Sequence, residues 1–195
     1  MPRFARHARA PFERWIKPRF AGKPIRYLEL GVWQGASAKW MFENILTHPD
    51  SKADLVDPWL PYEADAKHVY TQEMMDDALR SVDQMFEQQH KGFRCFIWQS
   101  DSISYLYECE DTYDLVYQDG AHDAKTVLMD ATALIGHEHK LVNPGGWIVF
   151  DDCNEPGVRK AVNVIADIFS DRLAPVYATK QQRCFEVRSQ DGQDG

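Results

Sequence analysis

The sequence predicts a single α/β domain built on a mostly parallel sheet with helices on both faces. Short apolar segments that suit buried strands alternate with segments whose apolar residues recur every three or four positions, as on the buried face of a helix. The chain has 195 residues, 44% hydrophobic and 27% charged, an ordinary balance for one globular core. We expect the domain to cover residues 25–189, after a basic N-terminal arm over residues 1–24 and before a disordered polar tail over residues 190–195.

The first strand, turn and helix organise this domain. An apolar strand over residues 25–30 leads into a turn that contains Gly31 and Gly35, and helical spacing follows up to residue 48. Glycine lets the backbone approach a ligand closely, and the first N–H groups of a helix attract an anionic group. We therefore expect a cofactor with a carboxylate or phosphate at this turn. A dinucleotide is disfavoured, because its G-x-G-x-x-G pattern requires glycine where Trp33 stands.

The residues of this turn resemble a known motif. The string ELGVWQGAS, residues 29–37, is similar to the first motif of class I S-adenosylmethionine-dependent methyltransferases, in the form found in catechol O-methyltransferase and its metal-dependent relatives. The resemblance implies a Rossmann-like, seven-stranded sheet whose last strand is antiparallel, with S-adenosylmethionine bound at Glu29, Gly31, Gly35 and Ser37. The alternative is an α/β domain whose first turn is simply rich in glycine.

The second strand, over residues 52–59, contains an acid that could also bind the cofactor. In wound α/β folds a carboxylate here accepts hydrogen bonds from the ribose hydroxyls, and Asp57 is the candidate. Turn chemistry offers another explanation, because aspartate is favoured in a turn before a proline such as Pro58. Residues 60–72 are polar and should form a loop near the cofactor, followed by an amphipathic helix over residues 72–89.

A third strand over residues 93–98 leads into a polar turn, residues 99–102. In the methyltransferases that this chain resembles, the corresponding turn borders the adenine. The resemblance thus implies that Ser100 or Asp101 hydrogen-bonds the amino edge of the base. A solvated turn without a ligand explains the same residues.

Two more strands end in residues that can do chemistry. The fourth and fifth strands are followed by polar pairs: residues 113–118 by Asp119 and His122, and residues 147–150 by Asp151 and Asp152. Asp123 is placed to cap the next helix, and a later helix has Pro156 in its first turn. Two last strands, near residues 175–179 and 184–188, complete the sheet.

Ligands of an open parallel sheet gather beyond the carboxyl ends of its strands. The residues expected to converge there are Gly31, Asp57, Asp119, His122, Asp151 and Asp152. Carboxylates held close together repel and raise one another's pKa unless a cation neutralises them. Oxygen ligands suit Mg²⁺, or Mn²⁺ or Ca²⁺, rather than zinc. A divalent metal at Asp119, Asp151 and Asp152 is therefore expected.

The family resemblance extends to these residues and suggests a mechanism. Relatives of catechol O-methyltransferase hold their metal with an aspartate after the fourth strand and an acidic pair after the fifth, which Asp119, Asp151 and Asp152 match. The catechol enzymes place a lysine base where this chain has His122, and the sequence looks more like the metal-dependent sugar O-methyltransferases of macrolide biosynthesis, in which a histidine is the base. The resemblance implies in-line methyl transfer to a metal-bound oxygen, with Asp119 and His122 as catalytic residues.

Simpler explanations exist for the same residues. His122 could be a helix-entry residue that bonds the backbone. Consecutive strand residues point to opposite faces, so Asp151 and Asp152 can both be ligands only if the chain turns there. Asp152 could instead cap the following helix.

The net charge of −8 argues against a nucleic-acid partner, and no apolar run is long enough to span a membrane. Eight Lys or Arg against one acid, Glu13, make residues 1–26 basic. Such an arm could be an organelle transit peptide, but it lacks serine and contains three prolines. We expect it instead to cover the cofactor mouth or to pair with the acidic body of the domain. The four cysteines show no paired spacing, which predicts free thiols and a cytoplasmic protein.

Two functions fit these observations. The first is a divalent-metal-assisted S-adenosylmethionine-dependent O-methyltransferase that acts on a hydroxyl of a small molecule, such as a sugar or another acceptor with neighbouring oxygens. The second is a Rossmann-like domain that binds S-adenosylmethionine or a nucleoside without such a reaction, with another acceptor or an interaction role. In either case a second subunit of a homo-oligomer could help to cover the acceptor site, because the chain has little inserted material.

Overall fold

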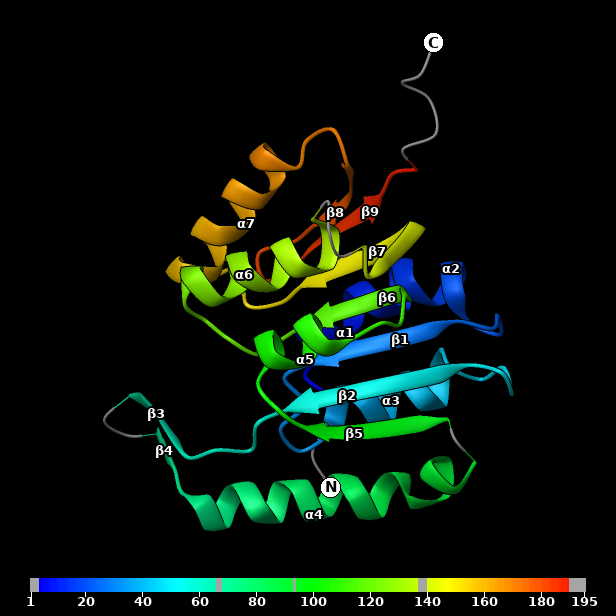
Figure 1. Cartoon of the computed structure of the whole chain (residues 1–195), viewed down its shortest axis with the longest axis vertical. Coiled ribbons are helices and arrows are strands. Elements are labelled where there is room, and N and C mark those ends of the chain that lie inside the picture. The colour runs from blue at the N-terminus through cyan, green and yellow to red at the C-terminus, as the bar shows by residue number, and fades with distance from the viewer. Residues whose placement is uncertain (1–3, 66–67, 93, 137–139, 190–195) are drawn as a thin grey trace.

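The computed structural model describes residues 4–65, 68–92, 94–136 and 140–189. Its centre is a seven-stranded sheet in the order β5-β2-β1-β6-β7-β9-β8 (Figure 1). The strands are β1 (Arg26–Leu30), β2 (Lys52–Asp57), β5 (Cys95–Gln99), β6 (Tyr113–Gln118), β7 (Val142–Phe150), β8 (Leu173–Ala178) and β9 (Arg183–Val187). The five strands from β5 to β7 pair in parallel, and β9 is antiparallel to both of its neighbours. The predicted Rossmann-like sheet with an antiparallel last strand is confirmed.

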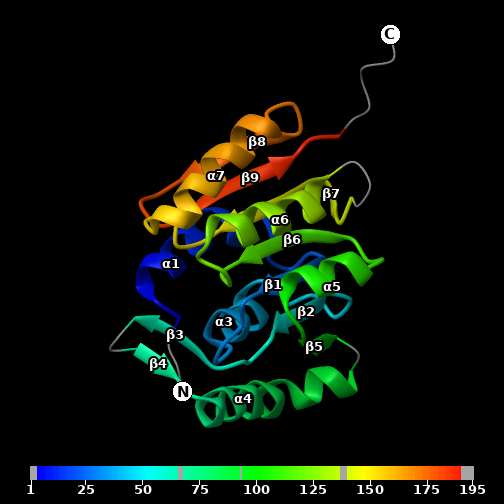
Figure 2. The same cartoon turned by 60° about the vertical axis from the view of Figure 1, so that its left-hand side comes forward.

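Helices cover both faces of this sheet, as Figures 1 and 2 show. One face carries α1 (Arg6–Pro11), η1 (Phe12–Ile16), α2 (Lys17–Phe20), α3 (Ala36–Asn44) and α4 (Gln72–Lys91). The other face carries α5 (Ser102–Glu108), α6 (Ala124–Ile135) and α7 (Pro156–Ile168). Successive residues of β1 point to opposite faces, so Tyr27 joins the first core and Leu28 the second. Both faces of β1 are therefore buried, as is usual for an inner strand of a parallel sheet, and even its Glu29 is fully buried.

The N-terminal arm contributes to the core through one side of its helices. Phe12, Ile16 and Phe20 follow one another at intervals of four residues and are all buried. This spacing places them on one face of the helical segment, against the sheet. The basic residues between them, Arg14, Lys17 and Arg19, are exposed, which explains why a basic arm can pack on an apolar core.

Two elements differ from the sequence prediction. Within the predicted loop over residues 60–72, β3 (Tyr62–Asp65) and β4 (His68–Tyr70) form an antiparallel hairpin. Tyr62 pairs with Tyr70, and their rings stack with centroids 4.6 Å apart, a cross-strand pair that favours strand over loop. Helix α5, which begins in the polar turn at residues 99–102, is not among the predicted helices. The predicted tail, residues 190–195, lies outside the described residues.

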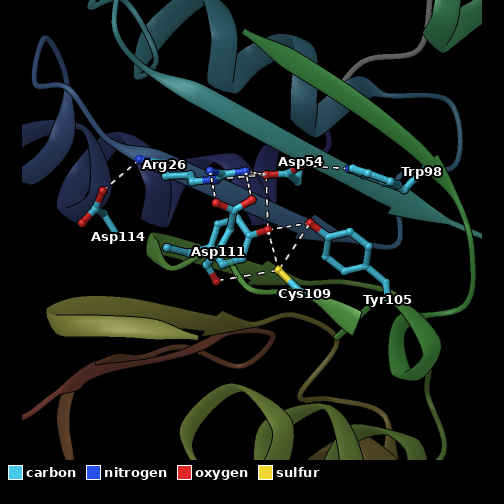
Figure 3. A network of polar contacts seen from close by, with 8 residues as sticks. Arg26, Asp54, Trp98, Tyr105, Cys109, Asp111 and Asp114 are labelled. Carbon is cyan, nitrogen blue, oxygen red and sulfur yellow. Dashed lines mark hydrogen bonds and ion pairs between the residues drawn. The ribbon is translucent and has the colours of Figure 1, made fainter. Parts of the chain in front are cut away.

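A buried polar network crosses the sheet on the face that α5 covers (Figure 3). Asp54 of β2 is 1% exposed and accepts hydrogen bonds from Arg26, Trp98 and Tyr113. The Arg26 guanidinium also forms a bidentate ion pair with Asp111, at 2.5 Å for both contacts. The network joins β1, β2, β5 and β6, because the three residues that donate to Asp54 lie on three different strands.

All four cysteines are free, as the sequence predicts, and Cys95, Cys153 and Cys184 are buried. None of the described helices combines the length and the apolar composition that crossing a bilayer requires.

Candidate functional site

A cavity of about 910 Å³ opens at the carboxyl ends of β1, β2, β6 and β7. All six residues expected to converge at this edge line it: Gly31, Asp57, Asp119, His122, Asp151 and Asp152. Ser37 and Asp101 line it as well. In Figure 1 the hairpin β3–β4 lies beyond the arrowheads of β2 and β5, and residues of this hairpin form part of the cavity wall.

Gly31 is required by the close approach of two strand ends. Its φ is +89°, in the region that favours glycine, and a Cβ there would overlap the backbone of Asp119 and Gly120. The backbone N–H of Asp119 donates to Leu30 at 2.8 Å, which holds the loop after β6 against the glycine turn. Gly31 thus brings two functional segments together, in addition to any role in contacting a ligand.

Helix α3 begins at the edge of the cavity. Gly35 precedes it with φ +73°, and no side chain caps its first turn. Ala36 and Ser37 of that turn line the cavity, whereas Gly35 does not. Uncapped N–H groups at the start of a nine-residue helix favour an anionic group, as the sequence analysis expects.

Glu29 does not line the cavity. Strand alternation turns it to the same face as Tyr27, under α3, where it is fully buried. Its carboxylate accepts hydrogen bonds from Ser37 Oγ and, at 2.7 Å, from the Tyr27 hydroxyl. Burial raises the pKa of Glu29 to about 7, although these two hydrogen bonds act in the opposite direction. The structure therefore places Glu29 behind Ser37, one side chain away from the cavity.

Asp57 lines the cavity and braces the glycine turn. Its Oδ2 accepts from the backbone N–H groups of Val32 at 2.9 Å and Trp33 at 2.8 Å, and its Oδ1 accepts from that of Trp59 at 2.7 Å. The hydrogen bond from Trp59 is the local turn interaction expected of an aspartate that precedes a proline. The structure thus contains the turn interaction and also leaves this carboxylate at the cavity wall.

The polar turn after β5 has a structural explanation of its own. Asp101 caps α5, accepting from the backbone N–H of Ser104 at 2.9 Å and from its hydroxyl at 2.7 Å. The bond from the Ser104 backbone is the main cause that lowers the pKa of Asp101. Asp101 still lines the cavity, whereas Ser100 does not and donates its hydroxyl to the Asp101 carbonyl.

Three carboxylates lie at the ends of β6 and β7. Burial, followed by the charges of Asp151, Asp152 and Glu29, raises the pKa of Asp119 well above its ordinary range. Burial also raises the pKa of Asp151, whose Oδ2 accepts from the Tyr117 hydroxyl and from Gln182 Nε2 at 3.1 Å. The expected mutual influence of neighbouring acids is therefore present at this edge of the sheet.

Asp152 forms an ion pair with His122. The distance between Asp152 Oδ2 and His122 Nε2 is 2.9 Å, and the side chains are 31% and 56% exposed. The chain turns at Asp152, where φ is +49°, so its side chain separates from that of Asp151. Asp152 does not cap the next helix, because the residue before α7 is Glu155, without a side-chain cap. The hydrogen bond to Asp152 is the first cause that raises the pKa of His122.

These carboxylates do not form a metal site as they are placed. In the part of the chain that the structure describes, no three His, Cys, Asp or Glu side chains are arranged to hold a metal ion. The oxygens of Asp151 face Tyr117, Gln182 and the Asp152 N–H, and Asp152 faces His122. The donor set is present, but two of its three carboxylates, Asp151 and Asp152, already have protein partners.

Sequence reasoning missed most of the cavity's aromatic residues. Phe4 lines it, and its ring lies 6.4 Å from that of Tyr117, which donates to Asp151. Tyr62 and Tyr70 come from the hairpin, and Trp33, whose bulk disfavours a dinucleotide, lines the same space. The β-forming residues on either side of residues 63–67 were the signal that could have revealed the hairpin.

Comparison with known folds agrees with this arrangement. TomG from Streptomyces achromogenes, an O-methyltransferase of tomaymycin synthesis solved with S-adenosylmethionine, is 16% identical with a TM-score of 0.61, covering 95% of this chain and 82% of its own. CalS11, a TDP-rhamnose 3'-O-methyltransferase of calicheamicin biosynthesis, is 13% identical with a TM-score of 0.60 (93% and 80%). The N-methyltransferase NodS from Bradyrhizobium japonicum WM9, solved with S-adenosylhomocysteine, is 12% identical with a TM-score of 0.59 (94% and 89%). These likenesses establish the fold.

Comparison with curated protein sequences gives no match. A family model described as a methyltransferase domain, however, matches residues 28–153. The matched segment begins in β1, before the glycine turn, and ends just after Asp152, so it contains both halves of the cavity edge described above. Because it covers more than half of the chain, the predicted enzyme class is confirmed, and this chain belongs to the family of methyltransferase domains.

Proposed function

We propose that this methyltransferase uses S-adenosylmethionine to methylate a hydroxyl group of a small molecule. The observation that carries the proposal is the His122–Asp152 pair, which lines the same cavity as the glycine turn and Asp57. A proton acceptor and a cofactor-binding turn on one cavity are the two requirements of methyl transfer to a hydroxyl.

The cofactor fits the wall formed by β1, β2 and α3. The uncapped first turn of α3, with Ser37, would receive the carboxylate of the amino acid part, and Asp57 would accept from the ribose hydroxyls. Glu29 would act through Ser37, whose hydroxyl it holds. Asp101 and Asp119, at the cavity wall, are the candidates for the adenine edge and for the ammonium group. When bound, S-adenosylmethionine supplies the methyl group.

His122 is the proposed general base. Its imidazole lines the cavity and is more than half exposed, and Asp152 would stabilise the imidazolium that forms when the acceptor hydroxyl gives up its proton. The pair with Asp152 favours a positive charge on His122 after proton transfer. Because the imidazole is exposed, it can then release this proton to solvent. Asp152 is therefore a positioning residue for His122.

Replacing His122 by Ala tests this role. We expect the chemical step to slow by about a hundredfold or more, because proton abstraction acts only on the transition state. Binding of S-adenosylmethionine, measured by isothermal titration calorimetry, should stay within about twofold of the wild-type value. An unchanged turnover number in the variant would remove His122 from the mechanism and leave it as a helix-entry residue.

The sequence also predicts that a divalent metal, Mg²⁺, Mn²⁺ or Ca²⁺, assists the reaction. Asp119, Asp151 and Asp152 would hold the ion only after Asp151 and Asp152 release their present partners. Turnover with S-adenosylmethionine, measured in excess EDTA and then with Mg²⁺ restored, distinguishes the two cases. Activity that persists supports His122 with Asp152 alone, and activity that returns only with Mg²⁺ shows that the carboxylates rearrange.

The alternative to O-methylation is transfer to another atom. One structural neighbour, NodS, is an N-methyltransferase, so the fold is compatible with a nitrogen acceptor. A screen of hydroxyl and amine acceptors with labelled S-adenosylmethionine separates the two. Tight binding of the cofactor without transfer to any hydroxyl would favour the alternative.

A further inference from the structure

One rim of the cavity consists of aromatic rings that the proposed function does not use. Trp33 of the glycine turn and Tyr62 of the hairpin β3–β4 line the cavity and are 45% and 51% exposed, which is unusual for tryptophan in particular. The Tyr70 ring stacks on that of Tyr62 and meets that of Trp33 edge to face, with centroids 6.0 Å apart. Rings that support one another in this way keep open faces beside the cavity, which suit a flat ligand.

The hairpin is fixed to the glycine turn and not to the main sheet. It forms a two-stranded sheet of its own, separate from the seven-stranded sheet in both views (Figures 1 and 2). Trp59, the buried residue before the hairpin, donates from Nε1 to the Trp33 carbonyl at 2.9 Å. Gln72, the first residue of α4, donates to the Trp59 carbonyl at 3.2 Å. Both ends of the hairpin are therefore held at Trp59, and Trp59 is held at the glycine turn.

The backbone at these contacts has a conformation that costs energy. Trp33 has φ +47° and Trp59 has φ +43°, in the left-handed region that glycine alone adopts freely. Asp57 fixes both residues there, because its carboxylate accepts from their backbone N–H groups at 2.8 and 2.7 Å. Residues under such strain gather at ligand-binding sites, where the surrounding structure holds them. Together with its exposure, the strain indicates that Trp33 contacts a ligand.

Asp57 has too few free lone pairs to bind both ribose hydroxyls of the cofactor. A carboxylate accepts about four hydrogen bonds, and Asp57 already accepts from two N–H groups of the glycine turn and from that of Trp59. Tyr62 can supply the missing partner. Partial burial is the main cause that raises the pKa of its hydroxyl, and the charges of Tyr70 and Asp57 add to the rise, so this hydroxyl lies within electrostatic reach of Asp57.

We propose that Trp33 and Tyr62 hold the nucleoside part of S-adenosylmethionine against Asp57, which makes the hairpin a second wall of the cofactor site. The adenine stacks on the open ring faces, and the Tyr62 hydroxyl binds the ribose oxygen that Asp57 leaves without a partner. The inference rests on the proposed function, which gives the cofactor the wall formed by β1, β2 and α3. It adds contacts from a segment outside that wall.

Two ligands separate the nucleoside from the rest of the cofactor. S-adenosylhomocysteine contains both parts, whereas 5′-methylthioadenosine contains the nucleoside without the amino acid. Both are titrated by calorimetry into the full chain and into its variants Tyr62→Ala and Trp33→Gly, the latter because glycine tolerates the local φ. We expect each variant to bind both ligands at least about tenfold more weakly than the wild type, as for the loss of one stacking partner.

Val69→Ala is the matched control. Val69 lies on the same hairpin and is 48% exposed, but it does not line the cavity. Its replacement should leave both affinities within about twofold of the wild-type values. Urea unfolding shows whether each variant is folded under the conditions of the titration. Equal losses in Val69→Ala and Tyr62→Ala would overturn the proposal, because the stability of the hairpin, and not ring contact, would then control binding.

Tyr62→Phe separates the ring from the hydroxyl. This variant keeps the stacking surface and removes one hydrogen bond, so it should bind both ligands about threefold more weakly than the wild type and more tightly than Tyr62→Ala. An affinity equal to that of Tyr62→Ala would overturn the stacking role. An affinity equal to that of the wild type would overturn the hydrogen bond to the ribose.

The titration of the wild type with S-adenosylhomocysteine distinguishes this inference from the proposed function. Absence of binding would refute the proposed cofactor and the inference with it. Binding that Tyr62→Ala and Trp33→Gly leave unchanged would overturn the inference alone and would assign the rings to the acceptor or to a partner. A loss of affinity for S-adenosylhomocysteine without a loss for 5′-methylthioadenosine would also overturn it, because the rings would then contact the amino acid part.

Discussion

Replacing Glu29 by Gln should make the protein more stable above neutral pH. Glu29 is fully buried, and the only partners of its carboxylate among the described residues are the hydroxyls of Ser37 and Tyr27. Neither partner carries a positive charge, so folding transfers an ionised carboxylate into the core without an ion pair. Burial accordingly raises its pKa to about 7 from the ordinary 4.5.

The sign of the effect follows from proton binding. Between pH 4.5 and 7 the folded protein holds a proton on Glu29 that the unfolded chain has lost, so this residue's contribution to stability is complete below pH 4.5 and is lost as pH rises through 7. The loss amounts to about 3 kcal/mol, at about 1.4 kcal/mol for each pH unit that separates the two pKa values. Glutamine resembles the protonated acid in shape and does not titrate.

Urea unfolding of the wild type and of Glu29→Gln between pH 4.5 and 8.5 measures this difference. The free energy of unfolding of the variant relative to the wild type should rise by about 3 kcal/mol across that range, with most of the change between pH 5 and 7. Glu87→Gln, on the exposed side of α4, is the matched control and should give a nearly flat difference. A flat difference for Glu29→Gln would refute the reasoning, because it would mean that the buried carboxylate has an ordinary pKa.

Other contacts lead to three further predictions. Gly31→Ala should lower the free energy of unfolding, measured in urea, by at least about 2 kcal/mol, because a Cβ would overlap the backbone of Asp119. Gly22→Ala is the control: Gly22 has φ +75° and no atom within 4 Å of a Cβ, so this variant has the same backbone strain without the overlap and should lose less stability. Asp57→Ala should weaken binding of S-adenosylmethionine by about 1.5 to 3 kcal/mol in calorimetry, and unchanged affinity would leave Asp57 with its turn role alone. Asp54→Ala should destabilise the fold by about 3 kcal/mol in urea, since it removes the shared acceptor of the buried network in Figure 3; a loss below 1 kcal/mol would show that the network contributes little.

The edge of the cavity could be predicted because it depends on one general rule. Strands in a parallel sheet point the same way, so residues that follow them in sequence meet in space even when they are far apart along the chain. Gly31, Asp57, Asp119 and Asp151 were placed together on this ground, and all of them line the cavity. Strand and helix periodicity identified the sheet and most of its helices for the same reason, since both depend on local spacing.

The tertiary structure decided which partner each of these side chains contacts. Glu29 belongs to the glycine-turn motif, but strand alternation turns it under α3 toward Ser37, away from the cavity. The sequence left open whether Asp152 binds a metal or caps a helix; the turn at φ +49° places it beside His122, and it does not cap α7.

The cavity wall was decided in the same way. The hairpin β3–β4 and the apolar side of the N-terminal arm bring Tyr62 and Phe4 to the site from segments with no motif. Sequence by itself determined the fold class, the order of the strands along the chain and the residues at their ends, because these follow from local periodicity and a common strand direction. The contacts among those residues depend on side-chain direction and on packing between distant segments, and only the folded chain specifies both.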